Sequence, residues 1–158
     1  MPFGIGSGGG VIFGATGGVM EAALRTVAEV VLGEEIADVE YNDVRGMEQT
    51  REAVIKVGEA EVKIAVVNGL RSAEEVIQKI QSGEAYYDFV EVMACEGGCI
   101  AGGGQPFVIG RAKAERSEGI YEADRMSGVR LSADNPVTEA LYKGLLAGDN
   151  AHHLLHYK

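Results

Sequence analysis

Residues Val92–Pro106 read VMACEGGCIAGGGQP and contain both cysteines of the 158-residue chain, Cys95 and Cys99. The apolar run before Cys95 is typical of a buried strand. Five glycines separate or follow the thiols, and glycine lets a backbone approach a neighbouring group closely. A strand that ends in a thiol-bearing glycine loop predicts a binding site at the edge of an open α/β sheet, where ligands usually sit.

The spacing of the two cysteines limits their chemistry. Two cysteines are too few for a disulfide framework, so a metal-ligand or redox pair is favoured. If they lie one helical turn apart, about 6 Å, they can hold two corners of one iron-sulfur cluster. A buried thiol pair and a redox disulfide stay open as alternatives, because one pair is half of the four cysteines that such a cluster takes.

The composition is that of one globular domain, and we expect residues 1–158 to form a single domain. The chain is 46% hydrophobic, yet no apolar run approaches the roughly 20 residues that span a bilayer, and the start lacks a signal-peptide pattern. We therefore expect a cytoplasmic protein without membrane contact. A net charge of −10, without clusters of Lys and Arg, argues against nucleic-acid binding.

Strands and helices alternate in the first half of the chain. Val11–Phe13 favours a short strand, followed by a glycine turn. Apolar residues at helical spacing predict a helix from Met20 to Gly33, with Glu21, Arg25 and Glu29 on the opposite face.

The pattern continues after this helix. Val39 and Tyr41 suggest a second strand. Residues 52–57 pair into a stronger strand at 62–67, which is apolar on both faces at its end. Ser72 has capping-box spacing before a helix at 73–81.

The remaining elements complete the fold class. A strand at 88–94 leads to Cys95. Helices follow within 111–125 and after Asn135, with a short helix or tail from His152. The predicted fold is an α/β lobe with a mainly parallel sheet of about four strands, flanked by helices, and a helical C-terminal part.

Several motifs resemble one family along nearly the whole chain. Residues 92–106 are similar to the third cysteine motif of the FeFe (iron-only) hydrogenase large subunit, approximately FMACxGGCxxGGGQP. GVIFGATGGVMEAALRT, residues 10–26, resembles the glycine-rich segment of the same catalytic domain. NPVTEALYKGLL at 135–146 and HHLLHYK at 152–158 resemble its closing NPxxxxLY and HxLLHTxY patterns. The resemblance implies one lobe of the FeFe hydrogenase catalytic domain.

The resemblance also implies site residues and a cofactor. Cys95 and Cys99 would be metal ligands of the H-cluster, a 4Fe-4S cluster bridged to a two-iron subsite, and Cys99 would be the bridging, catalytic thiolate. Phe13, Gly14 and Met93 fall on positions that line the two-iron pocket. The implied function is that of an oxidoreductase that interconverts dihydrogen with protons and electrons.

The chain departs from the family pattern in one respect. The other cluster cysteines and a proton-relay cysteine come from TSCCP-like and MPC-like motifs, which this sequence lacks. It therefore resembles the C-terminal portion of the catalytic domain. We expect the isolated chain to be without cofactor and inactive. The expected partners are the N-terminal half of the domain and an electron carrier, such as ferredoxin or an NAD(P)-linked subunit.

Other functions have weaker support in the sequence. Members of the same family act in iron-sulfur assembly without hydrogen chemistry, and a sensory role is a further alternative. IFGATGGVMEAA also looks like the first turn of a dinucleotide-binding domain, but the third glycine is missing. His152 and His156 have the spacing of a helical zinc pair without a further ligand. Asp124 and Arg125 are expected on a solvated helix face.

Overall fold

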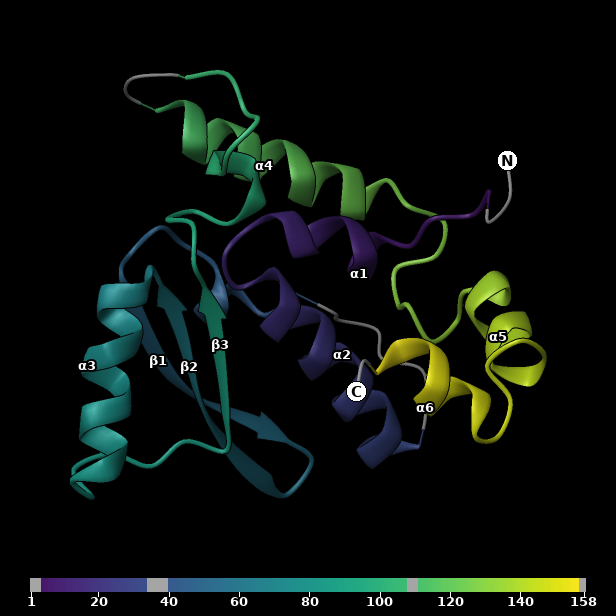
Figure 1. The fold of residues 1–158 in the computed structure, drawn as a ribbon, viewed down its shortest axis with the longest axis horizontal. Helices are drawn as coiled ribbons and strands as arrows, with labels where there is room; N and C mark the ends of the chain where they lie inside the picture. Colours follow the sequence, from purple (N-terminus) through teal and green to yellow (C-terminus); the bar gives the residue numbers. More distant parts are fainter. Residues whose placement is uncertain (1–3, 34–39, 108–110, 157–158) are drawn as a thin grey trace.

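The computed structural model describes residues 4–33, 40–107 and 111–156. One three-stranded sheet lies between two helices, and further helices cover one end of it (Figure 1). The described elements, with η for 3-10 helices, are α1 (Gly8–Val11), η1 (Ile12–Gly14), α2 (Gly18–Leu32), η2 (Asn42–Val44), β1 (Thr50–Val57), β2 (Ala60–Asn68), α3 (Leu70–Gln81), β3 (Phe89–Met93), η3 (Cys99–Ala101), α4 (Ala112–Arg125), α5 (Pro136–Lys143) and α6 (Asn150–Leu155).

Strand β2 is the centre of the sheet because its side chains are buried on both faces. Ile64 and Val66 pack toward α2 in a core that includes Met20 and Leu24. Ala65 and Val67, on the other face, pack with Ala73 and Val76 of α3. Alternate residues of a strand point to opposite faces, so β2 joins both layers of the fold. The predicted apolar end of this strand is confirmed.

The predicted α/β class is confirmed, but the sheet differs in detail. The described residues contain three strands rather than about four, in the order β1-β2-β3. β2 and β3 are parallel, whereas β1 and β2 are antiparallel. The reason is the short link after Val57, which pairs with Ala60. A two-residue hairpin turn can join only antiparallel neighbours, whereas parallel strands need a long crossover such as α3.

The predicted strand at Val11–Phe13 is wrong, because these residues are helical. Ser7 caps α1, its hydroxyl accepting from Gly10 N at 3.3 Å. Gly8 N and Gly9 N donate to the carbonyl oxygens of Val129 and Arg130 at 2.8 and 2.7 Å. These distant contacts override the local preference of the apolar residues for a strand.

Two further local predictions are corrected. Val39 lies outside the described residues, and Tyr41 is not in a strand but precedes η2. The capping position of α3 is Gly69 rather than Ser72, which is buried inside the first turn. The expected helix around Met20–Gly33 is confirmed as α2, which ends at Gly33 in the left-handed conformation.

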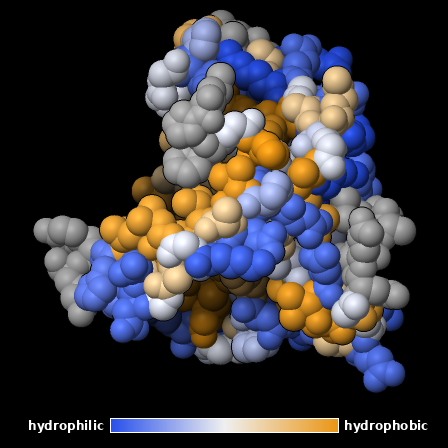
Figure 2. Space-filling model, turned by 90° about the vertical axis from the view of Figure 1, so that its right-hand side faces the viewer, coloured by the Kyte–Doolittle hydropathy of each residue, from blue (hydrophilic) through white to orange (hydrophobic). Residues whose placement is uncertain are grey.

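The C-terminal helices lie at the periphery of the described fold. α4 packs on α1 and η1. Asn135 caps α5 as expected, its side-chain oxygen accepting from Val137 N. Neither α5 nor α6 contains a buried residue. Hydrophobic areas are visible on the side of the molecule that carries these helices (Figure 2). Leu145, Leu154 and Leu155 are all more than half exposed.

Candidate functional site

The segment at 94–106, called here the cysteine loop, carries both thiols. It leaves the sheet at the C-terminal end of β3, as the sequence predicts. Gly98 N donates to Cys95 O at 2.9 Å, which closes a β-turn. Gly97 stands at its third position with φ +98°, as a type II turn requires. Cys99 then begins η3. The thiols are therefore separated by a turn and not by one turn of α-helix, which corrects that assumption. Both thiols are free and exposed.

Asn68 at the end of β2 holds this loop against the sheet. Its side-chain oxygen accepts from Gly97 N at 2.6 Å, and the residue is only 4% exposed. Gly69 N donates to Met93 O at 2.8 Å, which continues the parallel pairing beyond the last strand residue. The start of the loop is thus fixed by the neighbouring strand, although the sequence motifs do not point to Asn68. The sequence feature that could have pointed to Asn68 is its position as a polar residue at the end of an apolar strand.

The two glycine-rich segments are in direct contact. Thr16 N donates to Gly97 O at 3.3 Å. A Cβ atom at Gly98 would lie 2.7 Å from Gly14 O and 2.9 Å from Thr16 N. No side chain fits at such distances, so this junction requires glycine. The two glycine-rich segments therefore meet beside the end of β3.

The predicted pocket residues lie on the two sides of this junction. Phe13 and Gly14 belong to η1, whereas Met93 ends β3 two residues before Cys95. Phe13 is 47% exposed, and Gly14 and Met93 are half-buried. The structure therefore brings Gly14 and the cysteine loop together, while their roles toward a cofactor stay predictions.

Two basic side chains of α4 hold the far side of the cysteine loop. Arg116 donates to Ile100 O at 2.9 Å and to Pro106 O at 3.1 Å. Lys113 Nζ donates to Glu96 O at 3.3 Å. These contacts tie the backbone of the cysteine loop to α4 through two positively charged side chains, in a chain whose net charge is −10.

The donor set at this loop consists of the two thiols. The described part of the chain contains no group of three or more His, Cys, Asp or Glu side chains that could hold a metal ion. His152 and His156 stack with ring centroids 4.8 Å apart in and after α6. Two exposed cysteines in a glycine-rich loop fit one side of an iron-sulfur cluster, which takes four cysteine ligands. The described residues therefore supply two of the four ligands of such a site.

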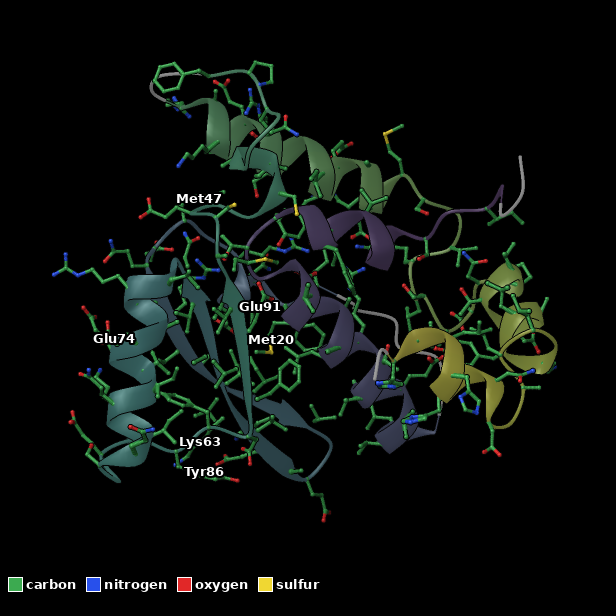
Figure 3. The ribbon with its side chains drawn as sticks, in the orientation of Figure 1. Met20, Met47, Lys63, Glu74, Tyr86 and Glu91 are labelled. Carbon is green, nitrogen blue, oxygen red and sulfur yellow. The ribbon has the colours of Figure 1, made fainter. Side chains whose placement is uncertain are left out.

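A buried carboxylate lies beneath the glycine turn, and the sequence motifs do not reveal it. Glu91 of β3 is 5% exposed and accepts hydrogen bonds from Gly17 N and Met20 N, both at 2.6 Å. Figure 3 shows Glu91 next to Met20 at the start of α2. Burial raises the pKa of Glu91 above its ordinary value, although the two backbone hydrogen bonds act in the opposite direction. A charged residue inside the apolar strand FVEVM is the available signal.

A second buried polar cluster joins α2 to α4. Arg25 and Asp124 are 1% and 0% exposed and form two hydrogen bonds of 2.8 Å. Arg25 also binds Glu21, and Arg130 binds Asp124. The expectation of a solvated face is therefore wrong for Asp124, whereas Arg125 is exposed. Sequence periodicity could not reveal a partner 99 positions away.

No helix among the described residues is long and apolar enough to cross a lipid bilayer.

Two family models match consecutive parts of the chain. The iron-only hydrogenase large subunit, C-terminal domain, matches residues 1–103. The iron hydrogenase small subunit matches residues 111–158. The first match ends after both cysteines and the second begins just before α4, so the Arg25–Asp124 pair joins the two matched parts.

Individual relatives agree with these matches. The NADP-reducing hydrogenase subunit HndD of Solidesulfovibrio fructosivorans is 42% identical over 98% of this chain and 27% of that protein. The cytosolic iron-sulfur assembly component 3 of Rattus norvegicus is 35% identical over 90% of this chain and 31% of that protein. A solved HydA structure that describes FeFe-hydrogenase H-cluster assembly has a TM-score of 0.69 and 35% identity, covering 90% of this chain and 44% of that one. The chain thus spans between about a quarter and under half of these relatives.

Proposed function

Because this chain belongs to the family of the iron-only hydrogenase large subunit, C-terminal domain, we propose that it is the C-terminal lobe of an FeFe hydrogenase. Residues 1–158 form one unit in this proposal, since Gly8 and Gly9 bind the backbone of Val129 and Arg130 across the two matched parts. The observation that carries it is the pair of exposed thiols on a turn docked against the glycine-rich segment.

In this proposal Cys95 and Cys99 hold one side of an H-cluster. When bound, that cofactor supplies the reversible conversion of dihydrogen to protons and electrons. Both thiols are exposed on one glycine-rich loop, so their sulfurs are accessible to a bulky inorganic group. Cys99 would be the thiolate shared between the 4Fe-4S part and the two-iron part, which makes it the catalytic residue of this chain.

The rest of the site would enclose the cofactor and exclude water. Phe13 and Met93 contribute apolar side chains from η1 and β3. Gly14 has no side chain, and a Cβ there would lie 2.8 Å from Ile120 Cδ1, so the backbone packs closely against α4. An apolar, gas-accessible wall suits a small neutral substrate such as dihydrogen. Glycine N–H groups are suited to donate to cluster sulfurs.

The missing ligands come from outside the described residues in this proposal. The partner is the N-terminal half of the same catalytic domain, and an electron carrier such as ferredoxin or an NAD(P)-linked subunit completes the electron path. The peripheral helices α5 and α6, which contain no buried residue, would pack on the rest of the parent protein. We propose a cytoplasmic location, which cell fractionation tests.

A second candidate function is iron-sulfur assembly without hydrogen chemistry. It is favoured by the 35% identity to the assembly component of Rattus norvegicus over 90% of this chain. Both functions use a cluster held by the same loop, so iron binding does not separate them. The exchange of hydrogen isotopes between dihydrogen and deuterated water separates the two functions, because only a hydrogenase catalyses this exchange.

The test is iron and acid-labile sulfide analysis of the parent protein, produced anaerobically with its maturation enzymes. Cys95→Ser and Cys99→Ser keep the size of the side chain but remove the soft donor, so we expect both to lower iron content. Ala94→Ser, in the same exposed loop, adds a hydroxyl without removing a thiol and should retain iron. Unchanged iron content in both cysteine variants contradicts the proposal.

A further inference from the structure

Glu91 is a buried carboxylate for which the proposed function gives no role. It lies in β3, where it pairs with Val66 of β2, and it is 5% exposed. Burying a charged group is unfavourable unless hydrogen bonds compensate for the lost water. Here both oxygens are used: Oε1 accepts from Gly17 N and Oε2 accepts from Met20 N, each at 2.6 Å.

The donors belong to the turn that follows Phe13 and Gly14. Gly17 adopts φ +92° and is the N-cap residue of α2, which offers no side-chain cap of its own. Free N–H groups at a helix start attract negative charge. The carboxylate therefore replaces the missing cap and ties the turn to the sheet (Figure 3).

Steric contacts leave this turn little freedom on its other sides. A Cβ at Gly17 would lie 2.0 Å from Val44 O, and one at Gly18 would lie 1.7 Å from Ile12 O. The buried Arg51 donates to Thr16 Oγ1 at 3.3 Å and to Val44 O at 3.2 Å. The turn is thus enclosed by Glu91, Val44 and Arg51 on one hand and by the cysteine loop on the other.

The same strand carries Glu91 and the first thiol. Glu91 precedes Cys95 by four residues, and β3 ends between them at Met93. The strand therefore holds two fixed points: the carboxylate that binds the glycine turn and the loop whose Gly97 O accepts from Thr16 N.

We propose that Glu91 is a positioning residue that sets the separation between the Phe13–Gly14 segment and the two thiols. This inference rests on the proposed function for its consequence, but its structural claim concerns only residues of this chain. Glu91 touches neither thiol in this scheme and acts through the turn. Gln cannot replace it, because its amide group would direct a donor at one of the two N–H groups. Asp is one methylene shorter and cannot reach both from the same strand.

The test is amide hydrogen exchange, measured by NMR on the 158-residue chain. In Glu91→Gln we expect exchange to rise about tenfold or more at whichever of Gly17 and Met20 faces the amide NH2 group, since the amide keeps only one acceptor oxygen for the two N–H groups. Positioning further requires that Thr16, whose acceptor is on the cysteine loop, exchanges faster as well. A cap that acts only on α2 would leave Thr16 unchanged, and that result overturns the proposal. Glu59→Gln, an exposed change in the β1–β2 turn, is the matched control.

Two further measurements keep the outcome decisive. Amides of α3 lie across the sheet and should not change; if they do, Glu91→Asp, which keeps the charge, is measured instead. If both variants unfold the whole chain, Glu91 acts on global folding and the proposal fails.

In the maturated parent, Glu91→Gln should retain iron but shift the infrared bands of the cofactor. Faster Thr16 exchange in a parent that binds no iron would refute the proposed function and leave the structural claim standing, whereas unshifted bands in an iron-loaded variant refute the positioning role.

Discussion

The molecule buries charge in two regions that have different tasks. Below the glycine turn, Glu91 binds only backbone N–H groups. Further along α2, Arg25 forms a bidentate pair with Asp124 of α4. The first arrangement fixes the path of the backbone beside the thiols, whereas the second fixes how two distant helices dock. Backbone donors suit positioning of a loop, and paired side chains suit recognition between separate segments.

The largest expected effect comes from breaking the helix pair. Asp124→Ala leaves Arg25, which is 1% exposed, without its main carboxylate. Removal of one partner of a buried ion pair lowers the free energy of unfolding by about 3–5 kcal/mol. Urea denaturation followed by circular dichroism measures it. Glu122→Ala, on the exposed side of the same helix and paired with Arg125, should change stability by less than about 1 kcal/mol. Equal effects of the two variants would show that the buried pair has no special role.

The second effect comes from the junction of the glycine segments. Gly98 adopts φ 84° and ψ −161°, a region that other residues occupy only at a penalty of about 1–3 kcal/mol. Gly98→Ala also places a Cβ 2.7 Å from Gly14 O, so we expect lower stability of the chain and lower iron content of the parent. Gly103→Ala is the control, because a Cβ atom at Gly103 would meet nothing within 4 Å. Thermal unfolding and iron analysis measure the two consequences, and a fully stable, iron-loaded Gly98→Ala protein contradicts this account.

A neutral contact provides a third, smaller effect. Asn135 accepts from Val137 N and donates to Ile5 O at 2.9 Å, so it caps α5 and binds the N-terminal segment. Asn135→Ala should lower the free energy of unfolding by about 1 kcal/mol, as loss of a helix cap does. Asp134→Ala, at the exposed neighbouring position, should have almost no effect. Urea denaturation of both variants measures the free energy of unfolding. If Asn135→Ala lowers it as much as Asp124→Ala does, charged and neutral contacts do not differ in their contribution to stability.

Elements that depend on contacts between residues close in the sequence could be predicted, whereas those that depend on distant residues could not. Local patterns identified α2, α4 and the capped α5, because helical spacing and caps involve neighbours within a few residues. The cysteine loop at the end of β3 was predictable for the same reason. The glycine residues that line the loop junction were recognisable as close-approach positions, although their partners were not.

Contacts between distant residues account for the errors. Val11–Phe13 is helical because the preceding glycines bind the backbone of Val129 and Arg130. The pattern predicts a solvated face for Asp124, since a polar residue in an amphipathic helix does not reveal that a distant residue such as Arg25 binds it. Glu91 was overlooked inside an apolar strand because its donors lie 71 and 74 positions away. The polar residues that shape the site were therefore the least visible ones.

The smallest expected effect is a difference in pH dependence between the two buried carboxylates. Burial acts to raise the pKa of Asp124, but hydrogen bonds from Arg25 and Arg130 outweigh it, and the pKa lies below its ordinary value. Its contribution to stability is therefore present above the unfolded pKa of about 3.9 and is lost as pH falls through the folded value. Burial raises the pKa of Glu91, so its contribution grows as pH falls through the folded value toward the unfolded one.

Urea denaturation between neutral and acidic pH separates these two signs. The stability difference between wild type and Asp124→Asn should shrink on acidification, because the ionised carboxylate is the form that binds Arg25. The difference between wild type and Glu91→Gln should instead increase, because protonation removes an unfavourable buried charge. Glu59→Gln corrects for exposed carboxylates. If both differences shrink in parallel, the two buried regions do not differ in their electrostatics, and hydrogen bonds to Gly17 and Met20 stabilise the ionised Glu91 more than burial opposes it.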